Sequence, residues 1–177
     1  MNYILDPKAD YGKPVLKRGL IIGDVQSGKT STYIGFICKA ADAGYKVFIL
    51  LTGTIESLRQ QTQERVEEGF IGIDMSANTT GGKRVGVGLD NKPIHAMALT
   101  SRASDFRGNS DKIAVSLGAD KDAVVFVIKK NTTTLTKLTK WLIDLNADPR
   151  THKIDMPMLM IDDEADNASI NTSSDKE

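Results

Sequence analysis

The segment from Gly23 to Ser31 has the residue types and the spacing of a phosphate-binding loop. It reads GDVQSGKTS, in which Gly23, Gly28, Lys29 and Thr30 fill the pattern G-x-x-x-x-G-K-[ST] without a mismatch. Glycines let the backbone curl so that successive N–H groups point at one anion, and the positive end of the following helix adds to the attraction. We therefore expect Lys29 to bind the outer phosphates of a nucleotide and the Thr30 hydroxyl to bind a magnesium ion.

The whole loop is a candidate for contact with the nucleotide. Gln26 and Ser27 lie at its tip, where they either touch phosphate or sugar or remain solvated. A guanine site would need the signature Asn-Lys-x-Asp, and NKPI at residues 91–94 lacks the aspartate, so ATP with Mg²⁺ is the expected cofactor. The candidate cofactor-binding residues are Gly23, Asp24, Val25, Gln26, Ser27, Gly28, Lys29, Thr30 and Ser31.

A second cluster, MLMIDDEAD near the C-terminus, supplies the carboxylates that such a loop needs. One must hold magnesium through water and another must orient the attacking water, and both come from the end of a neighbouring strand. Either Asp162 and Asp163 take these roles, or Asp163 and Glu164 do. Successive side chains of a strand point to opposite faces, which favours Asp163 as the metal-binding residue and Glu164 as the catalytic one.

These residues require an α/β framework, and the hydrophobic pattern predicts one. Continuous apolar runs rich in β-branched residues are typical of strands covered on both faces, whereas apolar residues at helical spacing predict the helices between them. The alternation indicates a three-layer domain with a mostly parallel central sheet. The predicted strands are 19–23, 46–52, 94–100, 123–130 and 156–166, and the predicted helices are 29–44, 54–69 and a segment from 131 or 132 onward.

Several details accompany this prediction. Gly44 and Gly69 are expected to end the first two helices, and Asn131 or Thr132 to cap the third. The glycine-rich stretch 70–93 is expected to form an irregular excursion or a small hairpin. Trp141 shares helical spacing with Leu138 and Leu142, which indicates core packing rather than base stacking.

Composition limits the remaining classes of protein. Lysine plus arginine and aspartate plus glutamate both number 23, so the net charge is +0 and no global field attracts nucleic acid or an anionic membrane. A chain with one cysteine forms no internal disulfide. One cysteine and two histidines are also too few to form a cluster of zinc ligands. No apolar run reaches the roughly 18 residues of a membrane span, and no signal peptide is visible, so a cytoplasmic location is expected.

The motifs at Gly23–Thr30 and Asp163–Asp166 together resemble motifs I and II of superfamily-two helicases and translocases. That resemblance implies a RecA-like ATPase fold over residues 19–177, preceded by an irregular lead-in at 1–18. It also implies contacts with a nucleic-acid backbone at strand ends, in the segments 51–65, 99–106 and 128–138. The candidate nucleic-acid residues, at strand ends and on the helix after the second strand, are Thr52, Gly53, Arg59, Ser101, Arg102, Lys129, Lys130 and Asn131.

A closer likeness is to the endonuclease family named for the Z-one domain (letter Z, numeral one). The segments VQSGKT, ADAGYKVFILLTG, LRQQTQER and IDDEADNASINT carry it, and they spread over residues 19–172. The resemblance implies a bacterial protein of restriction or repair type with DNA as its partner. It also implies a longer chain, because a second RecA-like domain would be needed to complete the ATP site. The nuclease activity in the family name gains no support, since DDEADNAS lacks the lysine of an Asp/Glu-x-Lys site.

Three functions compete on the sequence. The first is an ATP-driven DNA motor, the second is a switch ATPase that acts on a protein partner, and the third is a small-molecule kinase. A kinase usually needs an arginine-rich lid, and the arginines of this chain do not cluster. Stimulation of ATP hydrolysis by DNA would separate the first two.

Overall fold

The computed structural model describes residues 5–13, 15–22, 28–76, 81–90, 95–107, 117, 121–163 and 165. Its helices are α1 (Lys29–Ala43), α2 (Glu56–Val66), the π-helical turn η1 (Glu67–Ile71), the 3₁₀ turn η2 (Gly86–Asp90) and α3 (Thr132–Asn146). Its strands are β1 (Val47–Thr52), β2 (Ile73–Asp74), β3 (Lys83–Arg84), β4 (Ala96–Ala98), β5 (Ala123–Lys129) and β6 (Met158–Asp162).

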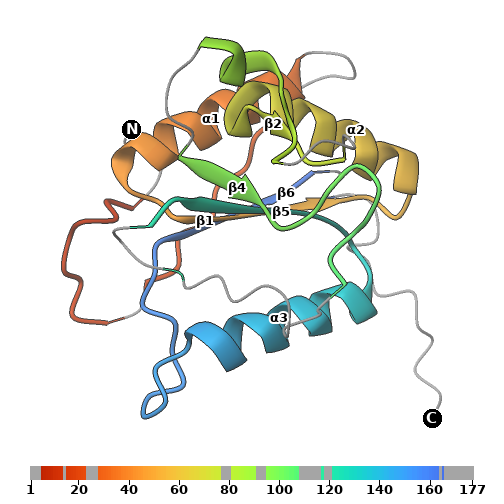
Figure 1. Ribbon diagram of the computed structural model, residues 1–177. Helices are drawn as coiled ribbons and strands as arrows, with labels where there is room; N and C mark the ends of the chain where they lie inside the picture. The colour runs from red at the N-terminus through yellow and green to blue at the C-terminus, as the bar shows by residue number, and fades with distance from the viewer. Residues whose placement is uncertain are drawn as a thin grey trace.

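The main sheet is parallel and has the strand order β4-β5-β1-β6. Val47 of β1 lies opposite Val124 of β5 and Met158 of β6, so the three strands end at the same edge. Helices α1 and α2 cover one face of this sheet and α3 covers the other (Figure 1). The predicted α/β class with three layers and a mostly parallel sheet is therefore confirmed, and the layout is compatible with a RecA-like domain.

The central strands bury side chains on both faces, as their continuous apolar runs predict. Phe48 and Leu50 of β1 join the core beneath α1 and α2, which includes Ile37. Val47 and Ile49 join the opposite core beneath α3. All six residues of β1 are buried, so the strand end at Thr52 is held firmly between two packed layers.

Helices α1 and α3 begin and end close to where the sequence predicts. Helix α1 ends at Gly44, whose φ of 116° is left-handed and whose N–H bonds the carbonyls of Ala40 and Ala41. Asn131 caps α3, since its side chain accepts a hydrogen bond of 2.8 Å from the N–H of Thr134. Trp141 packs against Phe106 and Phe126, which confirms its place in the core.

The second helix differs from the prediction in its end and in its buried face. It continues through η1 and stops at Gly72, which has a φ of 82°. Gly69 serves another purpose, because a Cβ there would lie 2.7 Å from Cγ2 of Ile34 on α1. Helical spacing predicts a face of Leu58, Gln61, Thr62 and Val66, which is right for Thr62 and Val66 and wrong for the other two. The buried face is mostly polar, because it also contains Arg59, Gln63 and Glu67.

The glycine-rich stretch contains the small hairpin that we expected as one alternative. Ile73 and Asp74 of β2 pair antiparallel with Arg84 and Lys83 of β3. Close approach of backbone explains part of its glycine content. A Cβ on Gly88 would collide with the carbonyl of Gly72, so a side chain at this position would push the two segments apart.

The predicted strand 19–23 is wrong in its described part. Residues 19–22 belong to no strand, and Leu20 and Ile22 are 79% and 87% exposed. A short apolar run forms a stable strand only where a neighbouring strand supplies hydrogen bonds, and within the described residues the sheet ends at β6. The described residues of the lead-in, 5–13 and 15–18, contain turns and extended chain without helix or strand.

Candidate functional site

The start of α1 presents a positive helix end, and its first turn carries no acidic side chain. Gly28 has a left-handed φ of 78° and Lys29 is exposed. An anion at this end would meet the N–H groups of the first turn and the ammonium of Lys29. Ser31 is also exposed, whereas Gly23, Asp24, Val25, Gln26 and Ser27 lie outside the described residues.

A buried tyrosine connects this helix end to the acidic cluster. The hydroxyl of Tyr33 donates a hydrogen bond of 3.3 Å to Oδ2 of Asp163, which is 130 positions further along the chain. The side chains of Thr30 and Thr62 lie close to the same hydroxyl. Burial, followed by the nearby charge of Asp163, raises the pKa of Tyr33 to about 12 despite the two threonines, so the tyrosine is neutral and a proton donor at pH 7. Thr30 and Asp163, the two predicted magnesium-binding residues, therefore share one partner.

The two consecutive aspartates contact different parts of the molecule. Oδ1 of Asp162 lies 2.7 Å from Nζ of Lys130, the residue directly after β5. Asp163 instead faces Tyr33 on α1, and its backbone N–H donates to the carbonyl of Leu51. The alternation of strand side chains produces this separation. Asp163, rather than Asp162, therefore lies on the side of α1, and Glu164 lies outside the described residues.

The donors near Tyr33 fit a magnesium ion in chemical type. A threonine hydroxyl and a carboxylate are both oxygen ligands, which this ion prefers, and Mg²⁺ commonly completes its shell with water and phosphate oxygens. Among the described residues no group of three histidine, cysteine, aspartate or glutamate side chains forms a metal site by itself.

Sequence reasoning missed Tyr33, although a signal for it was present. Tyr33 lies three residues after Thr30, so the two side chains share a face of α1. It also shares helical spacing with Ile37 and Ala40, which form the buried stripe of the helix. A tyrosine at the end of an apolar stripe, next to a polar motif, combines a buried ring with a hydroxyl that needs a partner.

A second charged region runs along one face of α2 and contains several candidate nucleic-acid residues. Arg59 is 0% exposed, although we expected an accessible side chain there, and this expectation is corrected. Its guanidinium donates to the carboxylate of Glu56 at 2.8 Å and to the carbonyls of Ser101 and Arg102, each at 3.0 Å. Arg59 therefore binds the backbone of the loop that begins after Thr100, and its side chain faces the protein interior.

Arg102 is bound by carboxylates from the same region. It contacts Glu67 at 2.7 Å, Glu64 at 2.8 Å and Asp74 at 3.8 Å. Burial raises the pKa of Glu67, and the hydrogen bonds from Arg102 and Gln63 only partly offset this effect.

Neutral hydrogen bonds complete the region. Gln63 donates to Glu67 and to the carbonyl of Thr100, while the Thr100 hydroxyl donates to Gln63 and accepts from the N–H of Val127. We call Arg59, Gln63, Glu67, Thr100 and Arg102 the α2 network.

The remaining candidate contacts at the strand ends are also engaged within the chain. Thr52 is buried and its hydroxyl donates to the carbonyl of Ile128, and Gly53 is buried beside it. Nζ of Lys129 lies 2.6 Å from Glu56, and Lys130 pairs with Asp162. If these side chains were to contact nucleic acid or take part in hydrolysis, those contacts would have to compete with the intramolecular bonds. The side chain of Asn131 is also engaged, because it caps α3.

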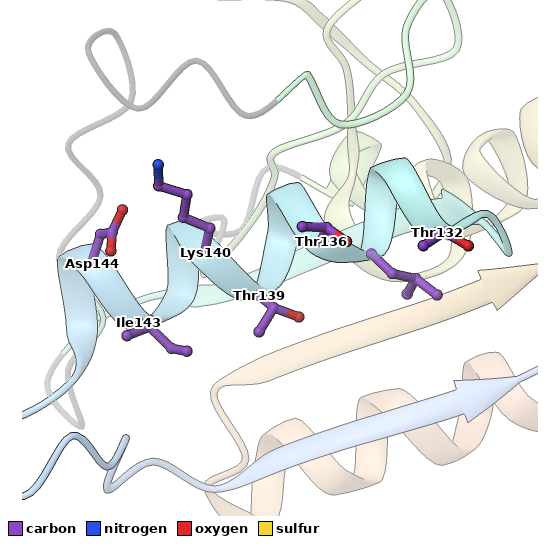
Figure 2. Close-up of a pocket in the computed structure, with 7 residues that line it drawn as sticks. Thr132, Thr136, Thr139, Lys140, Ile143 and Asp144 are labelled. Carbon is purple, nitrogen blue, oxygen red and sulfur yellow. The ribbon is translucent and has the colours of Figure 1, made fainter.

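Two surface depressions lie away from the Tyr33–Asp163 contact. One runs along the outer side of α3, where Figure 2 shows Thr136, Thr139, Lys140 and Ile143 along a single helix face. The other lies beside α2 and is lined by residues that include Gln60, Glu64 and Arg102. Neither is lined by Lys29, Thr30 or Asp163, so we assign neither to the candidate nucleotide site.

Comparison with known proteins gave no match: no protein-family model, no curated protein and no solved structure is significantly similar to this chain. The resemblance to helicase-type ATPases and to the Z-one domain family thus stays a prediction from the motifs. Within the described part of the chain, none of the helices has the length and apolar character needed to cross a lipid bilayer.

Proposed function

We propose that this chain is an ATP-binding and hydrolysing domain of a helicase-like DNA-processing protein. The observation that carries the ATPase part is the contact between Tyr33 and Asp163, which brings the acidic cluster to the helix of the phosphate loop. Tyr33 and Asp163 are 130 positions apart in the chain and in contact in the fold. Nucleotide chemistry requires a phosphate loop and a strand-end carboxylate close together, so this contact supports the proposal.

The roles of the residues follow from their chemistry. The exposed ammonium of Lys29 and the N–H groups at the start of α1 bind the phosphates. Thr30 and Asp163 hold the magnesium ion, which neutralises charge on the transferred phosphoryl group. Glu164 orients the attacking water and accepts its proton. Closure around the phosphates requires residues beyond this set, so we expect slow hydrolysis by this chain alone.

The DNA part of the proposal rests on the resemblance of the motifs. One observation favours the second candidate function, a switch ATPase that acts on a protein partner. Arg59, Arg102, Lys129 and Lys130 all form intramolecular ion pairs, and Arg59 has no exposed surface. Side chains that bind phosphodiesters are normally accessible, since their affinity comes from released counterions.

Calorimetric titration of ATP with magnesium into the chain and into Lys29→Ala tests the nucleotide site. We expect Lys29→Ala to weaken binding at least about a hundredfold, because it removes the cation that faces the phosphates. Lys39→Ala is the matched control, since Lys39 is an exposed lysine further along the same helix. Equal affinities of the wild type and Lys29→Ala would refute the site.

Turnover measurements separate the two candidate functions. Single-stranded and duplex DNA should raise the rate of ATP hydrolysis if the chain belongs to a DNA motor, and they should leave it unchanged for a protein-directed switch. Glu164→Gln should preserve ATP binding and reduce turnover by about 100-fold or more, the usual contribution of a general base. Loss of turnover in Asp163→Asn with a fully active Glu164→Gln would favour the alternative assignment of the acids.

A further inference from the structure

The hydroxyl of Tyr33 is the point at which three elements meet. Tyr33 lies on α1, Thr62 lies on α2, and Asp163 follows β6. The ring of Tyr33 is only 4% exposed and packs in the core with Ile37 and Ala40, so its hydroxyl has little freedom to move. A hydroxyl fixed in this way can set the orientation of the groups that bond to it.

Asp163 is a side chain whose orientation needs such a constraint. It comes directly after the last residue of β6, and its backbone is held through the N–H bond to Leu51. The neighbouring Asp162 turns to Lys130, so it gives Asp163 no support. The bond from Tyr33 occupies Oδ2 of Asp163, and a carboxylate retains further acceptor positions for a hydrated cation.

We propose that Tyr33 is a positioning residue for the magnesium ion: its hydroxyl fixes the Asp163 carboxylate beside Thr30 before the ion arrives. The inference rests on the proposed ATP site and deepens it. Tyr33 touches neither nucleotide nor metal in this scheme, and it acts through Asp163 and Thr30. Hydrogen-bonding partners of metal-binding carboxylates commonly have this role, because they reduce the reorganisation that accompanies binding.

The test is the dependence of ATP affinity on magnesium in Tyr33→Phe. Phenylalanine keeps the buried ring and removes only the hydroxyl, so the core remains filled. ATP affinity is measured by calorimetry with magnesium and again with EDTA, and the ratio of the two affinities is the magnesium-dependent gain. Tyr33→Phe should reduce this gain about tenfold and leave the affinity in EDTA unchanged.

Tyr45→Phe is the matched control. Tyr45 is also a buried tyrosine, and its hydroxyl donates a hydrogen bond of 2.9 Å to the carbonyl of Leu5, away from the acidic cluster. A purely structural role of Tyr33 predicts that both variants lose similar stability and keep the full magnesium-dependent gain. That result, or an equal loss of affinity with and without magnesium in Tyr33→Phe, would overturn the inference.

The same measurements distinguish failure of the proposed role of Tyr33 from failure of the proposed ATP site. A wild-type chain that binds ATP no better with magnesium than with EDTA would refute the proposed metal site and the role of Tyr33 together. A wild-type chain with a clear magnesium-dependent gain that Tyr33→Phe retains would leave the ATP site standing and refute only the role of Tyr33. Direct Mn²⁺ titration in the presence of ADP, followed by electron paramagnetic resonance, gives a second readout that does not depend on hydrolysis.

Discussion

The start of α1 and the α2 network both contain basic residues that sequence motifs indicate as candidate contacts. The two regions differ in whether these basic side chains are exposed or bound to other groups of the chain. In the α2 network the guanidinium of Arg59 has its donors directed at Glu56 and at two backbone carbonyls. At the start of α1, Lys29 is exposed and the first helical turn carries no acidic side chain. An exposed cation at a helix N-terminus whose first turn carries no acidic side chain remains accessible to an anion, whereas a buried cation with fixed partners stabilises the fold.

The contrast predicts opposite responses to substitution in the two regions. Changes near α1 and Asp163 should alter nucleotide binding with little loss of stability. Changes in the α2 network should lower stability with little effect on the affinity for nucleotide. Each of the following experiments can break this division.

Arg59→Met should have the largest effect on stability. It removes a buried donor from the carbonyls of Ser101 and Arg102 and one of the two cations bound to Glu56, which keeps Lys129, and we expect the free energy of unfolding to fall by about 3 kcal/mol. Urea denaturation measures the change, and ATP affinity at low denaturant should stay the same. Arg65→Met, at an exposed position of the same helix, should cost no more than about 0.5 kcal/mol. Similar losses in the two variants would contradict the structural role of Arg59.

Replacing the two aspartates one at a time should produce the next largest effect and sharpen the boundary between the regions. Asp163→Asn should reduce the magnesium-dependent gain in ATP affinity by about 10–100-fold, because it weakens a group that holds the metal. Asp162→Asn should leave this gain within about twofold and lower the free energy of unfolding by about 1 kcal/mol, since its ion pair with Lys130 is partly exposed. The reverse outcome would show that the metal-binding acid lies one position earlier.

The smallest effect concerns the pH dependence of stability in the α2 network. Burial raises the pKa of Glu67 above its usual value of 4.5, so the folded chain binds this proton more tightly than the unfolded chain does. The contribution of Glu67 is therefore complete below pH 4.5 and declines as the pH rises through the folded pKa. Burial lowers the pKa of Arg102, but the hydrogen bond to Glu67 and the charges of Glu67, Asp74 and Glu64 together raise it, so Arg102 stays charged throughout.

Glu67→Gln isolates this contribution because glutamine does not titrate. The free energy of unfolding of the wild type minus that of Glu67→Gln should be greater at about pH 4 than at about pH 7. Denaturation curves at both values measure it, and Glu68→Gln at the next, exposed position is the control. A difference that grows toward neutral pH would mean that attraction to Arg102 outweighs the loss of hydration of Glu67.

The sequence predicts the repeating parts of this fold well and the particular contacts poorly. The buried strands β1 and β5 and the helices α1 and α3 follow from continuous apolar runs, helical spacing and capping residues such as Gly44 and Asn131. The buried face of α2 does not, because Arg59 and Glu67 are charged and periodicity assigns them to the surface. Their bonds to residues 101 and 102 span 35 to 43 positions of the chain, so no local pattern reveals that this face is buried.

The candidate site shows the same limit. The motifs indicate Lys29, Thr30 and Asp163 without reference to structure, since each belongs to a spacing that phosphate chemistry requires. Tyr33 emerges only when α1 and the end of β6 are placed together. The run 19–22 also needs tertiary context, because its apolar residues suggest a strand that the described sheet does not contain.

The exposed run and the outer edge of β6 have a consequence for handling the isolated chain. β6 is bonded to β1 on one side, its Met160 is 54% exposed, and the apolar run 19–22 is largely uncovered. Within the described part of the chain the outer edge of β6 is unpaired, and an unpaired strand edge is a template for sheet extension between molecules. We expect purified chains to self-associate as their concentration rises. Met160→Lys should reduce this association, because it places a charge on the exposed strand.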